Sequence, residues 1–401
     1  MLVGIHFGRD RLELDVDPDH VIPVQRQVPL PALDNVSAAV SEGLEIPYEY
    51  PALRKALTPD DHVAVVVDEA LPRVAELITP ILEHIVSAGV RPDAITLLCP
   101  ASPSRQEWLE ELPEALEEVR LEVHDGSDRK KMAYLATTKQ GRRVYLNRTA
   151  VDADQLVLLT GRRYDPLVGV SGCESVLYPV LTDKATREEL WTHLSPAAPH
   201  EAAWPVRQEA SEIAWLVGAP FVVQVIEGAG DSVAHVLCGS IQASGHGQRL
   251  LDSHWLLKAP ERADLVIATV SGAPAWHSLA DLAHALACAA RVVRSDGRIV
   301  LLSEAAPALE HGAELIRQAE DPQQALALLK ESKPPDMSAA YHWLLAAQQA
   351  RIYLLSGLPS ETAEELFTVP LDSAAQVQRL IGPSDKVLIL EDAHKMLAMV
   401  K

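Results

Sequence analysis

The sequence predicts an α/β protein with two domains, each built on a largely parallel sheet flanked by helices, and an active cleft between them. The run VAVVV at 63–67 is continuously apolar, as expected of a strand that is buried on both faces. Residues 74–86 then place apolar side chains at helical spacing, and ITLLC at 95–99 has the composition of the next strand. Strand, helix and strand in this order are typical of a parallel sheet.

The remaining elements of the first half follow the same logic. Further strands are expected at 121–123, 144–147 and 156–160, where short runs are rich in Val, Leu and Tyr. Pro80 lies inside the first helical pattern and predicts either a kink or a late helix start. The stretch SAGV at 87–90 places a glycine where a helix commonly ends.

The character of the chain changes between residues 185 and 215, where a helical pattern is broken by Pro196 and Pro199. We place the domain boundary here, which gives an N-terminal domain of residues 1–200 and a C-terminal domain of residues 201–401. A second α/β series is expected after it, with strands at 220–227, 232–240, 263–269, 297–304, 351–357 and 386–392.

Charge and composition exclude several classes of partner. The 35 lysines and arginines against 56 aspartates and glutamates give a formal charge of −21, so phosphate backbones and anionic lipid surfaces are repelled. We therefore expect neither nucleic acid nor membrane as a partner. A small anionic substrate stays possible, because a local basic pocket can override the global field. Aromatic residues make up only 4%, so the cores must be built mainly from Val, Leu, Ile and Ala.

The sequence is that expected of a soluble cytoplasmic protein. Arg9 and Asp10 interrupt the first apolar stretch too early for a secretory signal, and no apolar run reaches the 18 residues that a membrane span requires. The cysteines are far apart and form no CxxC pair, which argues against a disulfide framework and a cysteine-rich zinc site. They are Cys99, Cys173, Cys238 and Cys288.

Several collinear stretches point to a family. VAVVVDEALPR at 63–73, VSGC at 170–173, ADLVIATVSGAP at 263–274 and RSDGRIVLLSE at 294–304 are the main ones. Together with stretches between them, they cover most of residues 45–310 and resemble the nickel-pincer lactate racemases and their relatives. The resemblance implies racemisation of a small 2-hydroxy acid, or a related anion, by removal and return of a hydride. It also implies a pyridinium mononucleotide that holds nickel.

The resemblance implies a cofactor-binding set, which is Asp68, Arg105, Gly169, Ser171, Gly172 and Ser175. In the family, a lysine soon after the glycine turn carries the cofactor covalently, and Ser175 takes that position here. Serine cannot form that amide-like bond, and Lys184 lies nine residues further along. We therefore expect no covalent pincer cofactor on this chain.

The resemblance also implies positions for catalysis. The acid/base groups would be drawn from Asp165 (or its neighbour Tyr164), His193 and His284, and His193 is the candidate nickel ligand. The expected substrate-binding residues are Arg73, Asp281 and His284. We expect Asp68, Arg105, the turn at 169–175 and the helix at 277–284 to face a polar cleft between the domains.

Each position also has an ordinary structural interpretation. Asp68 is a good helix N-cap, and a glycine turn can simply be a tight connection. Asp165 precedes a proline and can start a turn, and His193 at the end of a helix can complement the helix dipole.

His277, Asp281 and His284 are spaced four and three residues apart, so they share one face of a helix. Such a row can relay protons or hold a divalent metal. The alternative is a solvated face on which Ser278 and Asp281 form a capping pair. If the row lines the cleft, replacement of His284 by alanine should abolish ligand or metal binding and cost less than about 1 kcal/mol of stability. A solvated face would tolerate the change without any effect on binding, whereas a core histidine would cost stability.

Two functions remain open from the sequence. The first is a racemase or epimerase of a small 2-hydroxy acid at a nickel-pincer-type site. The second is a relative that binds a small ligand or a partner without racemising anything. The serine at position 175 is the feature that distinguishes them. The oligomeric state is left open.

Overall fold

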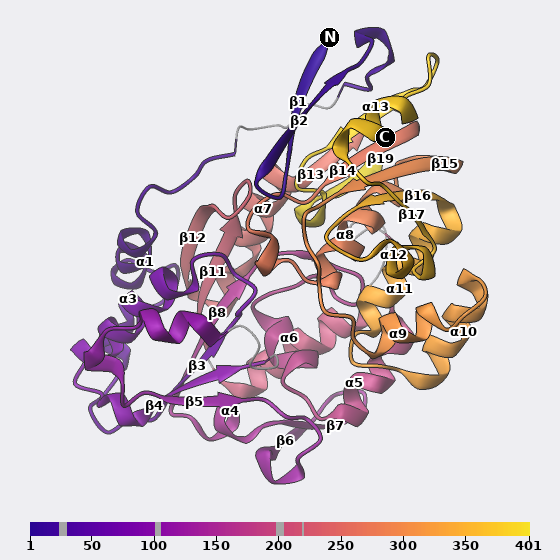
Figure 1. Ribbon diagram of the computed structural model, residues 1–401. Helices are drawn as coiled ribbons and strands as arrows, with labels where there is room; N and C mark the ends of the chain where they lie inside the picture. The colour runs from indigo at the N-terminus through magenta and orange to yellow at the C-terminus, as the bar shows by residue number, and fades with distance from the viewer. Residues whose placement is uncertain (24–29, 101–105, 198–203, 219) are drawn as a thin grey trace.

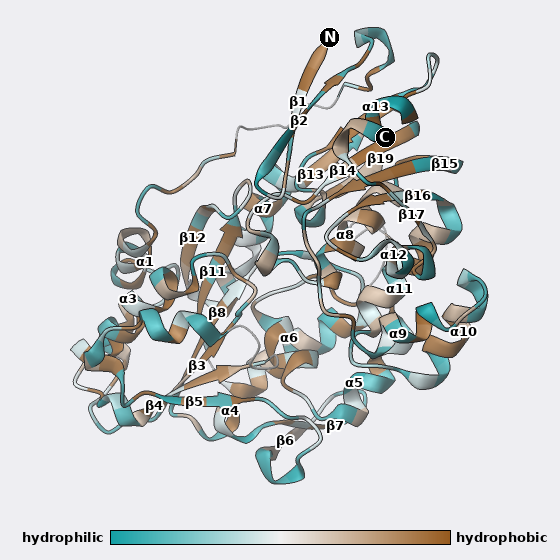
Figure 2. Cartoon of the chain, in the orientation of Figure 1, coloured by the Kyte–Doolittle hydropathy of each residue, from teal (hydrophilic) through white to brown (hydrophobic). Residues whose placement is uncertain are grey.

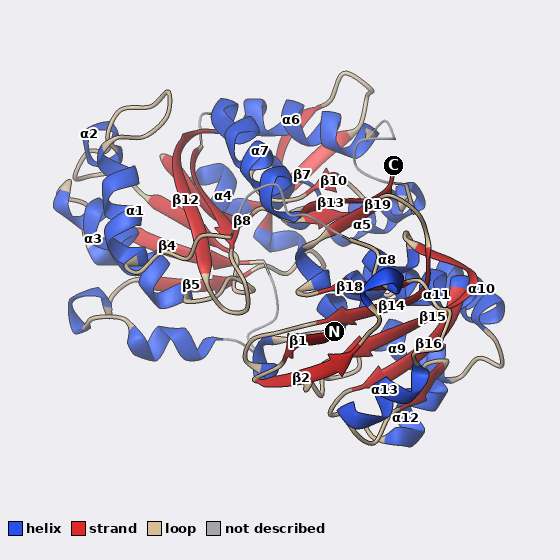
Figure 3. Ribbon diagram, turned by 90° about the horizontal axis from the view of Figure 1, so that it is seen from above, coloured by secondary structure: helices blue, strands red, loops and turns tan. Residues whose placement is uncertain are grey.

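The computed structural model describes residues 1–23, 30–100, 106–197, 204–218 and 220–401. Figure 1 shows two α/β bodies, one coloured mainly purple and magenta and the other orange and yellow. Figure 3 shows their sheets as two separate groups of strands with helices around them. The predicted fold class, two largely parallel sheets flanked by helices, is confirmed. No helix in the described part of the chain is long and apolar enough to cross a membrane.

The first sheet has six strands, and five of them run parallel. Its order is β12 (Val233–Ser240), β11 (Phe221–Glu227), β8 (Gln155–Gly161), β3 (Val63–Val67), β4 (Ile95–Cys99) and β5 (Arg120–Val123). Only β12 is antiparallel to its neighbour. The helices around this sheet are α1 (Val36–Glu45), α2 (Leu53–Ala56), α3 (Val74–Ser87), α4 (Arg148–Asp152), α5 (Lys184–Leu190) and α6 (Pro205–Val217).

Strand β3 lies at the centre of this body, and every one of its residues is buried. Val65 and Val67 pack into one apolar cluster with α1 and α3, whereas Val66 packs into a second cluster on the opposite face. Helix α3 begins at Val74, ahead of Pro80, so the late helix start that Pro80 allowed is not observed. Figure 2 shows the central strands of both bodies mostly in the brown of hydrophobic residues.

The second sheet has five parallel strands. Its order is β17 (Thr368–Pro370), β16 (Ala350–Leu355), β15 (Val293–Leu302), β14 (Ala263–Thr269) and β18 (Val387–Leu390). The helices that follow β12 along the chain are α7 (Ser244–Trp255), α8 (Leu279–Ala290), α9 (His311–Arg317), α10 (Pro322–Ser332), α11 (Met337–Gln349), α12 (Ser360–Glu365) and α13 (Val377–Leu380).

Four two-stranded pairings complete the described structure. They are β1 (Leu2–Phe7) with β2 (Asp10–Asp15), β6 (Met132–Thr137) with β7 (Arg143–Asn147), β9 (Tyr164–Asp165) with β10 (Gly169–Val170), and β13 (Leu256–Ala259) with β19 (Leu397–Val400). The strand expected at 144–147 therefore exists, but it lies in an antiparallel hairpin outside the main parallel sheet.

The sheets divide the chain differently from the predicted boundary at residues 200 and 201. Strands β11 and β12 extend the first sheet, because β11 pairs in parallel with β8 from Phe221 onwards. The β1–β2 hairpin, in contrast, packs on the second sheet through Ile5, Phe7 and Leu14. The first body is thus formed by residues from about 30 to 240, and the second takes both ends of the chain.

Candidate functional site

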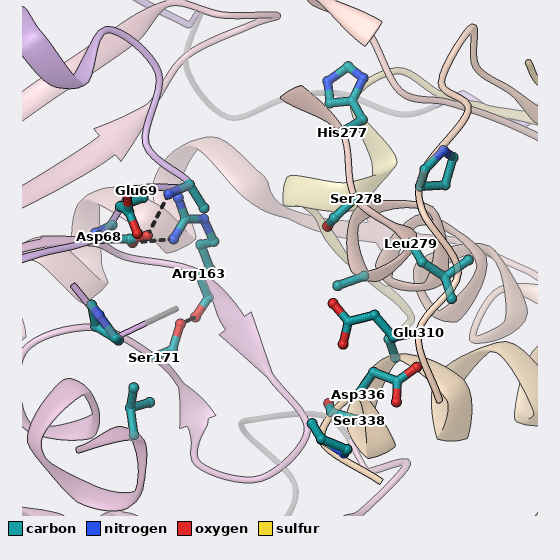
Figure 4. Close-up of a pocket in the computed structure, with 18 of the residues that line it drawn as sticks. Asp68, Glu69, Arg163, Ser171, His277, Ser278, Leu279, Glu310, Asp336 and Ser338 are labelled. Carbon is teal, nitrogen blue, oxygen red and sulfur yellow. Dashed lines mark hydrogen bonds and ion pairs between the residues drawn. The ribbon is translucent and has the colours of Figure 1, made fainter. Parts of the chain in front are cut away.

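A cleft with a volume of about 940 Å³ lies between the two bodies. One wall comes from the segments that follow strands β3 and β8, together with the turn around Ser171, and ligands of parallel α/β sheets gather at such strand ends. The other wall comes from residues 274–280, the loop at 304–310 and the start of α11. Figure 4 shows the two walls facing each other.

Arg163 is held at the centre of the first wall by two carboxylates. Its guanidinium lies 2.5 Å from Asp68 Oδ2 and 2.8 Å from Glu227 Oε1. Asp68 also accepts hydrogen bonds from the backbone N–H groups of Ala70 and Gly161, each at 3.1 Å. Burial alone would lower the pKa of Arg163, but the two carboxylates outweigh it and hold that pKa above its usual value. Asp68 therefore positions an arginine.

The glycine turn bonds mainly to itself and to β8. The backbone N–H of Ser171 donates to Arg163 O at 2.8 Å, and that of Cys173 donates to Thr160 Oγ1 at 3.1 Å. The Ser175 hydroxyl donates to Gly172 O at 3.2 Å. These groups are consequently engaged within the protein, which favours a tight connection over an anion-binding loop.

Gly172 is required by the path of this turn. Its φ is +88°, and a Cβ added there would lie 2.5 Å from Gly161 O. The chain therefore passes directly over the end of β8, and this close approach brings Ser171 and Ser175 to the cleft.

The second wall begins with His277 and Ser278, just ahead of α8. The Ser278 N–H donates to Asp281 Oδ2 at 2.7 Å and the Asp281 N–H donates to Ser278 Oγ at 3.4 Å, which together form a capping box. Burial would raise the pKa of Asp281, but His394 and the hydrogen bonds from Ser278 outweigh it and lower that pKa. The capping interpretation of Asp281 is thus confirmed, and its carboxylate is engaged at the helix start.

His284 lies in a second, much smaller cavity of about 30 Å³. We call this the histidine pocket, and its lining includes Tyr164, Asp165, His284, His342 and His394. The ring of His284 lies 5.5 Å from that of His342, and the ring of His277 lies 5.6 Å from that of His394 (centroid distances). Burial lowers the pKa of all four imidazoles.

Asp165 and Tyr164 also serve structural roles in this pocket. Asp165 Oδ1 accepts the N–H groups of Leu167 and Val168 at 2.8 and 2.9 Å, as expected of a carboxylate that starts a turn. The Tyr164 hydroxyl donates to Asp252 Oδ1 at 2.9 Å, and burial together with that carboxylate raises the pKa of Tyr164.

Three further predicted site residues lie outside the cleft lining, and one is not described. His193 is exposed at the end of a short turn after α5 and does not line the cleft. Arg73 pairs with Glu76 at 2.5 Å within the first turn of α3. Arg105 lies outside the described residues. Gly169 is buried beside Trp204, and only later residues of the turn that it begins line the cleft.

The structure therefore brings together only part of the predicted set. Asp68, Ser171, Gly172 and Ser175 face residues 277–280 across the cleft, whereas His284 lies in the neighbouring pocket. Sequence reasoning missed Arg163, although a cation directly after an apolar strand was a usable signal.

Comparisons with known proteins agree with this architecture. Residues 7–191 match the family model described as lactate racemase N-terminal domain. The lactate racemase apoprotein from Thermoanaerobacterium thermosaccharolyticum superposes with a TM-score of 0.81 at 16% identity, over 99% of this chain and 100% of that one. A crystal structure of a Thermotoga maritima protein gives 0.71 at 13% identity, over 92% and 100%. No curated protein matches. The predicted resemblance to the lactate racemases is confirmed.

Proposed function

We propose that this protein binds a small organic ligand non-covalently in its interdomain cleft, and that it is not a racemase built on a covalently attached nickel-pincer nucleotide. The observation that carries this proposal is Ser175, which lines the cleft and whose hydroxyl donates to Gly172 O. The sequence resemblance implies that the family has its anchoring lysine at this position.

The residues present do not fit the covalent cofactor. No lysine is among the described residues that line the cleft. Lys184 is mostly exposed and pairs with Glu188 at 3.6 Å, so it does not replace the missing anchor. Among the described residues, no group of three His, Cys, Asp or Glu side chains is arranged to hold a metal ion. His193, the candidate nickel ligand, lies away from the cleft lining.

The expected acid/base groups give the same result. Asp165 and His284 line the histidine pocket, and His193 is exposed, so none of the three borders the cleft as described. His277 is the one histidine among the described lining residues. General acid/base chemistry requires the side chain to be within hydrogen-bonding reach of the substrate.

Racemisation of a small 2-hydroxy acid is the second candidate. The match of residues 7–191 to the lactate racemase family model favours it. The cleft volume of about 940 Å³ is at the upper end of small-molecule sites, and it has room for a nucleotide-sized group beside a small acid. In this candidate the nucleotide is held without a covalent bond, and His277 replaces the lost acid/base histidine.

Lactate racemisation and nickel content decide between the two candidates, and intact mass tests whether any cofactor is covalently attached. The protein is produced in cells that synthesise the pincer cofactor, and mass, nickel content and lactate racemisation are measured. We expect the mass of the sequence alone, no stoichiometric nickel and no racemisation. Lactate racemisation, or added mass on any lysine, would contradict the proposal.

A matched variant keeps that experiment informative. Ser175→Lys restores the side chain of the family at the same place in the cleft. Added mass on this variant but not on the wild type would assign the loss of the covalent link to residue 175. We expect Ser175→Ala, which changes the same position without adding an amine, to have the mass of its own sequence.

A further inference from the structure

Negatively charged side chains outnumber positively charged ones on the cleft wall. The described lining carries five carboxylates and one permanent cation, which are Asp68, Glu69, Glu304, Glu310, Asp336 and Arg163. Arg163 is already paired with Asp68 and with Glu227 outside the lining. The wall that the structure describes thus has no free cation with which to receive an anionic substrate.

Three of these carboxylates lie on the second wall, and their described partners are uncharged. Glu304 Oε2 accepts the backbone N–H of Arg9 at 2.7 Å. The carboxylate of Asp336 accepts the N–H groups of Gly312 and Ala313 at 2.7 and 3.2 Å. Glu310 precedes α9 and makes no capping hydrogen bond with its side chain. Negative charge is therefore left uncompensated along this side of the cleft.

Glu310 and Asp336 lie beside each other on this wall, as Figure 4 shows. Partial desolvation and the neighbouring Asp336 charge both raise the pKa of Glu310. Glu310 is exposed and Asp336 is partly buried. Two like charges side by side destabilise one another, and a cation placed against them stabilises both. This pair is consequently a point of attraction for a positively charged group.

His277 is a second, independent feature of the cleft wall that points to a bound ligand. It is 9% exposed, it lines the cleft, and its buried Nδ1 has no hydrogen-bond partner among the described residues. Burial lowers the pKa of His277, so the ring is neutral at pH 7 and has one acceptor nitrogen. Apolar side chains such as Leu279, Val176 and Pro307 cover other parts of the walls and suit a carbon skeleton.

From these contacts we propose that the cleft selects an organic cation, a small molecule with a protonated amine and a carbon body, which places its ammonium group against Glu310 and Asp336. This inference rests on the proposed function and names its ligand class. It differs from the 2-hydroxy acid that the sequence resemblance implies. The net charge of −21 assists it, because an acidic surface raises the local concentration of cations.

Three molecules of one skeleton test the proposal. The probes are protonated 1-amino-2-propanol, neutral propane-1,2-diol and anionic lactate, which share a methyl-carbinol unit and differ in charge. Saturation-transfer NMR at pH 7.5 measures binding of each to the full chain, in competition and alone. We expect the amine to bind more tightly than the diol, and lactate to bind most weakly.

Two variants locate the interaction. Glu310→Gln keeps the shape and removes the charge, and we expect it to weaken amine binding about tenfold, as the loss of one charge-assisted hydrogen bond would. Glu331→Gln on α10 removes the same charge from an exposed position outside the cleft and is expected to change nothing. Melting temperatures close to that of the wild type confirm that both variants fold.

Each other outcome is decisive. Preferential binding of lactate would overturn the charge inference and leave the binding function intact. Equal binding of amine and diol, unchanged in Glu310→Gln, would also overturn it. Absence of binding by all three would overturn this inference, whereas the proposed function is tested separately by mass, nickel content and racemisation.

Discussion

The interdomain cleft and the histidine pocket lie at the two ends of one stretch of chain, yet they differ in volume and in the charge of the side chains that line them. Residues 277–280, at the start of α8, line a cleft of about 940 Å³. His284, only four residues on, lines a pocket of about 30 Å³. The cleft walls carry ionised groups, whereas burial holds the histidines of the pocket neutral by lowering their pKa.

This difference teaches that a shared helix face is not a shared site. The spacing of His277, Asp281 and His284 does place them on one face, but α11 packs against α8 and closes that face after its first turn. Only the first turn reaches the cleft. We therefore expect substitutions in the cleft wall and in the histidine pocket to separate cleanly into effects on ligand and effects on stability.

The largest effect is expected from Arg163→Ala. This variant is the exception to that separation, because Arg163 lines the cleft and also stabilises the fold through its ion pairs. Its removal leaves the mostly buried Asp68 without a charged partner and leaves Glu227 only Lys395 at 3.5 Å, which we expect to cost about 3 kcal/mol of unfolding free energy. Urea unfolding followed by circular dichroism measures it. The control is Arg54→Ala, whose ion pair with Glu45 at 2.7 Å is exposed and worth less than about 1 kcal/mol. Equal losses in both variants would refute the structural role of Arg163.

The second effect is acid destabilisation centred on the histidine pocket. Burial and Lys395 lower the pKa of His394 from 6.5 to about 4, although Asp392 and Asp281 oppose the shift. As the pH falls below 6.5, the unfolded chain binds this proton and the folded chain does not, so stability decreases until about pH 4. We expect a loss on the order of 2 kcal/mol over this range.

Unfolding free energies at several pH values between 7.5 and 4.5 measure this loss. His394→Gln, which cannot titrate there, should show a flatter dependence than the wild type. Carboxylates that titrate below pH 5 affect both proteins alike, so the difference between the two curves isolates the histidine. Parallel curves would show that the pocket histidine is not the source.

The smallest effect is expected from His284→Ala. The expectation of less than about 1 kcal/mol assumed a face that lines the cleft, but the ring packs against His342 inside the pocket. We now expect a cost between about 1 and 2 kcal/mol, as for an ordinary partly buried side chain. Binding of the amine probe in the cleft should be unchanged. If His284→Ala bound the amine more weakly at wild-type stability, the interdomain cleft and the histidine pocket would have to be regarded as one site.

The central strands could be predicted from the sequence because they are short, strongly apolar runs, and 63–67 and 156–160 lie where expected. The domain boundary could not. An apolar run such as that of β11 has no feature that says which sheet it joins, and parallel pairing with β8 bridges more than 60 residues of sequence. The packing of the β1–β2 hairpin on the second sheet is equally non-local.

The residues of the candidate site also include some that could be predicted from the sequence and some that could not. Asp68 and the turn at Ser171 were predictable because they directly follow buried strands or carry a glycine requirement. Glu310 and Asp336 meet through the folding of two loops, and no spacing in the sequence signals it. His342 and His394 reach the pocket from elements more than 50 residues apart.

The hairpin at the start of the chain has a consequence for synthesis on the ribosome. Val21 bridges to Val387, and the backbone N–H of His6 donates to Glu391 Oε1 at 2.9 Å. These two contacts therefore form only after residues 387–391 have been translated. At about 5–20 residues per second, they follow translation of the hairpin by roughly 20 to 80 s, and the body around β3 can fold in the meantime. Completion of the second body thus waits for β18 and Glu391.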